Sequence, residues 1–206
     1  QSWATVSASA RDVAIGGTAP APEAQRRAVA VAEAVDGVRA VSDVSGLLPI
    51  ISPFVWSARR QGNGIALTGS VPSEGSRAAI LAAARRAVPD AEIADGMTLA
   101  RGAAPSFNAA VTFALARLAS LSDGVVSVTD GVLTVSGTAR SAAAFADVRQ
   151  AIAAAPPAGL AIGAADILPA RADPFVLSAS FDGKTLFLTG AGAIWRIRLD
   201  VTGSPY

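Results

Sequence analysis

The chain has 206 residues with 17 basic and 16 acidic side chains, and it contains neither histidine nor cysteine. This balanced charge argues against a strongly basic nucleic-acid binder. The missing residue types exclude zinc and haem sites with His or Cys ligands, and nucleophilic catalysis by Cys or by a Ser-His pair. The sequence therefore predicts a protein that is not an enzyme, with no metal and no cofactor.

The mean hydropathy of +0.45 is high, but it reflects abundant alanine and dispersed apolar residues. The most apolar stretch, residues 151–168, is interrupted by Pro156 and Pro157, so we expect no segment to cross a membrane. The chain starts at Gln1 without an initiator Met or a signal peptide, which predicts a processed chain or a fragment.

Predicted elements alternate along the first half of the chain. The first are a strand at residues 13–17, a helix with Pro22 in its first turn and a strand at 38–44. They are followed by a hairpin with its turn at 61–64, a helix capped by Ser73 and a strand at 91–99. In each group, one helix is predicted with strands before and after it along the chain.

The second half repeats this order with one addition. A helix is predicted at 106–121, before a hairpin with an Asp130-Gly131 turn, a helix capped by Ser141 and a strand at 160–168. The last residues, from Trp195 to Thr202, alternate apolar and polar side chains, which is the period of a strand.

An internal repeat underlies these elements. Glycines end the second strand of each predicted hairpin at positions 17, 69, 137 and 190, and the segment 53–58 returns at 174–179. The predicted fold class is α+β, with tandem β-β-α-β units, one with a leading helix, and sheets covered by Ala-rich helices. The expected repeats are residues 1–51, 52–103, 104–171 and a partial fourth repeat at 172–206. Units of this size bury little alone and should pack on one another.

The motif after each hairpin resembles the BON family, named for bacterial osmotic-shock and nodulation proteins. It is a glycine followed by Ser or Thr, as in Gly69-Ser70-Val71-Pro72-Ser73-Glu74 and Gly137-Thr138-Ala139, then an Ala-rich helix. A Gly-Val-x-x-Val strand follows, seen here as residues 37–41. The repeats also resemble the N-terminal part of outer-membrane-protein-A-like envelope proteins.

The resemblance implies a noncatalytic binding module in the periplasm or at the outer-membrane periphery of a Gram-negative bacterium. Its implied partner is an anionic phospholipid surface or an envelope protein, with no nucleic acid. The alternative is a structural assembly protein of the envelope that forms homo-oligomers without binding lipid.

Six residues are candidates for the contact with lipid or partner. They are Trp56, Arg59, Arg60, Trp195, Arg196 and Arg198. Aromatic rings anchor interfaces, and arginines attract anionic headgroups. For Trp56 the competing interpretation is burial in the core, because it shares a strand face with Phe54. For the arginines it is a solvated surface or a guarded sheet edge. Three acidic residues, Asp90, Glu92 and Asp95, could in principle bind Ca²⁺, but their spacing favours a solvated loop.

Overall fold

The computed structural model describes residues 3–154, 156–170, 178–181, 185–190 and 193–198. It divides the chain into two compact units, Gln1–Pro169 and Ala170–Tyr206. The architecture is mixed α+β, built from small β-β-α-β units whose sheets pack against helices, which confirms the predicted fold class.

The first sheet contains the N-terminal repeat. Its strands are β1 (Ala4–Ser9), β2 (Asp12–Ala19), β3 (Ala40–Asp43) and β4 (Gly46–Leu47). The strand β1 forms an antiparallel hairpin with β2 and lies at the edge of the sheet, whereas β3 and β4 pair with β2 in parallel. Helix α1 (Pro22–Glu33) makes the crossover between β2 and β3 and packs on both strands.

The second and third repeats share one six-stranded sheet. Their strands are β5 (Val55–Gln61), β6 (Gly64–Val71), β7 (Glu92–Leu99), β8 (Leu121–Thr129), β9 (Val132–Ala139) and β10 (Ala161–Leu168). The order is β10-β9-β8-β5-β6-β7, and the two repeats meet where β5 pairs antiparallel with β8. The repeats are therefore joined by backbone hydrogen bonds as well as by side-chain packing.

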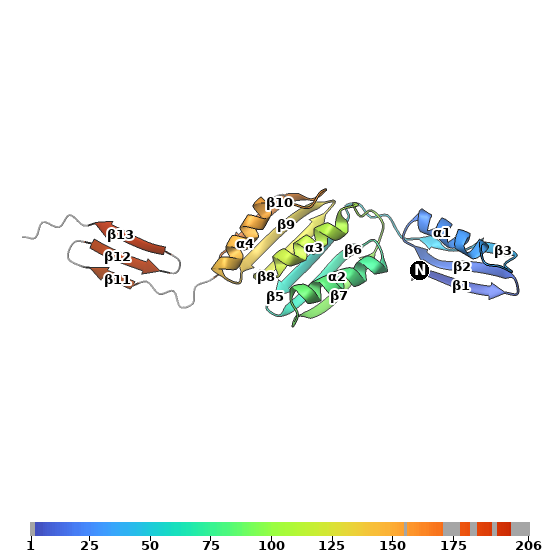
Figure 1. Cartoon of the computed structure of the whole chain (residues 1–206), viewed down its shortest axis with the longest axis horizontal. Coiled ribbons are helices and arrows are strands. Elements are labelled where there is room, and N and C mark those ends of the chain that lie inside the picture. Colours follow the sequence, from blue (N-terminus) through green and yellow to red (C-terminus); the bar gives the residue numbers. More distant parts are fainter. Residues whose placement is uncertain (1–2, 155, 171–177, 182–184, 191–192, 199–206) are drawn as a thin grey trace, which may run out of the picture. The chain divides into compact units, whose positions relative to one another are not determined.

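Three helices cover one face of this sheet: α2 (Glu74–Ala87), α3 (Phe107–Leu118) and α4 (Ala142–Ala153) (Figure 1). Helix α3 contacts β5 from the second repeat and β8 and β9 from the third, and it also packs against α2. The leading helix of the third repeat thus covers the seam between both repeats.

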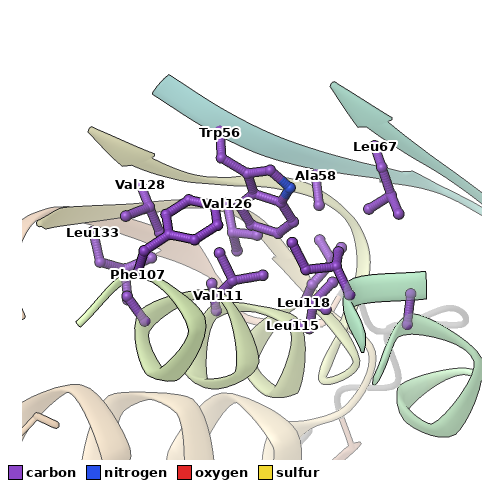
Figure 2. Close-up of a cluster of buried hydrophobic side chains, with 14 of the residues drawn as sticks. Trp56, Ala58, Leu67, Phe107, Val111, Leu115, Leu118, Val126, Val128 and Leu133 are labelled. Carbon is purple, nitrogen blue, oxygen red and sulfur yellow. The ribbon is translucent and has the colours of Figure 1, made fainter. Parts of the chain in front are cut away.

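One hydrophobic cluster fills the space between the helices and the sheet. Figure 2 shows Trp56 and Ala58 of β5 directed towards α3, whose apolar side chains approach from below. The helix contributes Phe107, Val111, Leu115 and Leu118, each 4% exposed or less. Because residues from both repeats belong to this cluster, neither repeat has a separate core.

The glycines that define the repeat occupy equivalent places in the first three hairpins. Gly17, Gly69 and Gly137 all have positive φ angles, of 105°, 94° and 146°. A Cβ atom on Gly69 would lie 2.4 Å from the carbonyl oxygen of Val55, and the other two glycines have similar backbone clashes. Only glycine combines this φ angle with so close an approach of the neighbouring strand.

The second unit contains a three-stranded antiparallel sheet. Its strands are β11 (Ser178–Phe181), β12 (Thr185–Gly190) and β13 (Ala193–Arg198), in that order. The alternation predicted at the C-terminus is confirmed as strand β13. The Asp182-Gly183 turn and residues 199–202 lie outside the described residues.

The end predicted from the sequence for the leading helix of the third repeat is wrong. The helix was expected to run to Leu121, but α3 ends at Leu118, and Leu121 is the fully buried first residue of β8. The apolar spacing of the helix continues into a strand residue that also faces the core, so periodicity alone could not separate the two elements.

Candidate binding surfaces

Trp56 lies in the core and not on a contact surface. Its side chain is fully buried, and the indole N–H donates a hydrogen bond to Sδ of Met97 at 3.4 Å. The alternation along β5 turns Trp56 towards the helices, as Figure 2 shows. Its assignment as a contact residue is therefore wrong, and burial together with Phe54 is confirmed.

Arg59 lies on the opposite face of the same strand, away from the helices. The side chain is exposed, and its neighbours across the sheet are Ala66 on β6 and Val125 on β8. Within the described part of the chain, its guanidinium forms no hydrogen bond and no ion pair. This cation is consequently available to an external anion.

Arg60 serves a structural purpose that the sequence analysis did not identify. Its Nη1 donates to the carbonyl oxygen of Ala119, just after α3, at 3.0 Å, and its Nε donates to Gly62 O at 3.1 Å. Partial burial lowers the pKa of Arg60, as does the nearby cation Arg140, while Asp123 opposes them. A cation that binds the last carbonyl groups of a helix also stabilises the helix dipole.

The other three candidate residues belong to the second unit. The backbones of Trp195, Arg196 and Arg198 lie in β13, which pairs with β12. Their side chains lie outside the described part of the structure, so their role as contact residues stays a prediction.

A hollow that the sequence analysis missed lies between α1 and the first hairpin. Its volume is about 440 Å³, and its lining is almost entirely apolar, including Val6, Val13, Ile15, Val31, Val35 and Val38. Three of these valines are markedly exposed: Val6 at 66%, Val31 at 63% and Val35 at 55%. Exposed apolar surface of this kind marks an interaction site more often than a solvated face.

Of the three acidic residues considered for Ca²⁺, Asp95 has protein partners for its carboxylate. Asp95 forms a 2.7 Å ion pair with Arg77 and accepts a hydrogen bond from the backbone N–H of Met97. Among the described residues, no three His, Cys, Asp or Glu side chains are grouped so that they could hold a metal ion. The helices in the described ranges are too short or too polar to cross a membrane.

Two segments of the chain match known domain families. Residues 4–44 match the BON domain, and residues 57–100 match the BON-like domain. These two matches support a tandem arrangement of BON domains in the chain. The first match covers β1 to β3 with α1, and the second runs from Ser57 within β5 to the end of β7 and includes α2. No curated protein matches the chain.

A general function is associated with the BON family. BON domains are associated with binding to phospholipid or to envelope components, and the family consists of non-enzymatic binding modules. The third repeat has the same order of elements as the two matched segments: a hairpin ending in glycine, a helix and a parallel strand.

Proposed function

We propose that this tandem BON-domain protein is a noncatalytic module of the periplasm or outer-membrane periphery that binds anionic phospholipid or another envelope component. The observation that carries the proposal is the pair of BON matches, at residues 4–44 and 57–100. The helices of the second and third repeats lie on one face of the six-stranded sheet (Figure 1), and we propose that the contact is made by the opposite face.

Short, partly exposed side chains line this face. Ser57 on β5, Ser127 on β8 and Thr134 on β9 alternate with buried residues of the helix-facing side. Arg59 lies on this surface, and its neighbours on the adjacent strands are Ala66 of β6 and Val125 of β8. A single arginine near an anionic membrane contributes about 1 kcal/mol of binding free energy.

Vesicle flotation with the full chain tests this location. Reversing the charge in Arg59→Glu replaces attraction by repulsion, so binding to phosphatidylglycerol vesicles should weaken by about 2 kcal/mol, roughly 30-fold. The matched control is Arg85→Glu, which changes the net charge equally on the exposed side of α2. Binding by the control should stay close to that of the unmodified chain.

Two results would contradict the proposal. Absence of binding by the unmodified chain to anionic vesicles at low salt would exclude the lipid function. Equal losses in Arg59→Glu and Arg85→Glu would show that net charge alone drives binding and would remove the open face as the site.

Arg60 is unsuitable for the comparison because it also holds the end of α3. The double variant Arg196→Glu/Arg198→Glu tests the second unit separately.

A further inference from the structure

The edge strand β1 lacks the features that normally prevent edges from pairing. Its sequence, Ala-Thr-Val-Ser-Ala-Ser, contains no charge and no proline, and its pairing with β2 is regular over all six residues. By contrast, the edge strand β7 carries Glu92 and Asp95, and β10 carries Asp166 next to a register shift. Proteins use such charges and irregularities to keep sheet edges from joining. Among the described residues no strand pairs with the outer edge of β1, so this edge can accept another strand.

The strands that correspond to β1 in the other repeats pair with each other. Aligning the hairpins on Gly17, Gly69 and Gly137 matches Val6 with Ala58 in the second repeat and with Val126 in the third. In the antiparallel ladder between β5 and β8, Ala58 lies directly opposite Val126. Equivalent positions therefore meet at the centre, so this junction has the register of a two-fold axis.

The apolar hollow of the first repeat adds a second observation. The 52-residue offset between Gly17 and Gly69 matches Val31 and Val35 with Ala83 and Ala87 of α2. Those alanines line the same shallow hollow as Leu115 of α3, so the second repeat places α3 against this face. The described chain provides no such cover for the first repeat, which leaves Val6 66% exposed.

We propose that β1 pairs antiparallel with β1 of a second copy of this chain, with Val6 opposite Val6 on a two-fold axis. In the same register, Ala4 lies opposite Ala8, and Thr5 lies opposite Ser7. This arrangement copies the β5–β8 junction and covers Val6 at the seam, and no like charges meet because β1 is uncharged. The two-fold contact is closed, so it produces a dimer and not a fibre. It does not depend on lipid binding.

Disulfide trapping tests the register directly, because the chain contains no cysteine. Residues directly opposite each other in an antiparallel pair have Cα atoms about 4.5–5.5 Å apart, which fits a disulfide. Val6→Cys should therefore form a covalent dimer when a mild oxidant is added. Ala8→Cys is the matched control on the same strand face. Its two copies would lie four residues apart along the ladder, about 13 Å, and should not cross-link.

Sedimentation velocity tests the association without cross-linking. The unmodified chain should sediment as a dimer at high concentration. Val6→Lys should be a monomer, because it places two cations opposite each other at the axis. Val35→Lys, at an exposed position on the helix side of the hollow, should remain a dimer. Circular dichroism of both variants checks that the fold is kept.

Three results would overturn the proposal: a monomer at every concentration, a dimer that persists in Val6→Lys, or equal cross-linking of Val6→Cys and Ala8→Cys. A monomer that binds a synthetic peptide with the sequence of α3 would assign the hollow to a helix instead. A monomer that binds neutral vesicles, and loses this binding in Val6→Lys, would assign the hollow to lipid chains. Both outcomes exclude a second copy as its occupant.

Discussion

Removing one buried side chain from α3 should destabilise the second and third repeats together. Leu118 is 1% exposed and belongs to the same cluster as Leu67 of the second repeat and Val126 of the third. Truncation of a fully buried leucine to alanine costs about 2–5 kcal/mol, depending on how far the cavity collapses. Both flanking surfaces are parts of one hydrogen-bonded sheet, which limits collapse. We therefore expect Leu118→Ala to lose about 3 kcal/mol.

Urea unfolding combined with native-state hydrogen exchange measures this effect. The free energy of exchange should fall by the same amount for amides in β6 and in β9, because the repeats unfold as one cooperative unit. Thr112→Ala, at an exposed position of the same helix, is the control and should change stability by less than about 0.5 kcal/mol. A loss of protection confined to β8, β9 and β10 would refute the shared core and show that α3 serves only its own repeat.

Three further predictions concern two helix starts and one pH dependence. Ala21 precedes α1 with the extended backbone of an N-cap (φ −159°, ψ 156°) but no capping side chain, so Ala21→Ser should stabilise the first repeat by about 1 kcal/mol in urea unfolding. Ser73→Ala should cost α2 a similar amount, since Ser73 accepts from Ser76 N–H, and equal stability of both variants and the unmodified chain would contradict the capping argument. Burial alone would raise the pKa of Asp95, but hydrogen bonds from Arg77 and Met97 lower it below its ordinary value of 3.8. The stability lost in Asp95→Asn should therefore be largest at neutral pH and vanish as the pH falls through this lowered pKa, whereas a pH-independent difference would exclude the ion pair as its source.

The sequence predicted the local parts of each repeat well, because their signals lie within a few residues. Ser73 and Ser141 were expected to cap helices, and each accepts a hydrogen bond from the N–H three residues later. The Asp130-Gly131 hairpin turn was also expected, and both residues have positive φ. Capping and turn formation depend on neighbouring residues, so they can be predicted without knowing the rest of the fold.

The joining of the repeats could not be predicted in the same way. The contact between β5 and β8 brings together residues more than 60 positions apart, such as Ala58 and Val126. Nothing in the alternation along either strand distinguishes this neighbour from another edge, because both strands alternate in the same manner. Packing of the repeats on one another was expected, but not the shared sheet or the position of α3 over its seam.

The candidate contact residues show how far composition can locate a site. Trp56 and Arg59 are three residues apart, yet the alternation of β5 directs one into the core and the other to the open face. Arg60, the next residue, donates a hydrogen bond to the C-terminal end of α3, a helix that starts 47 positions later in the sequence, at Phe107. Residue type alone made all three residues candidates for a contact with a partner. The face of β5 on which each side chain lies, and the hydrogen bond from Arg60 to Ala119, decide which of them can make that contact. Arg60→Glu should weaken the end of α3 as well as change the charge, so a binding loss larger in Arg60→Glu than in Arg59→Glu would reflect both effects. Stability must be measured beside binding to separate the two.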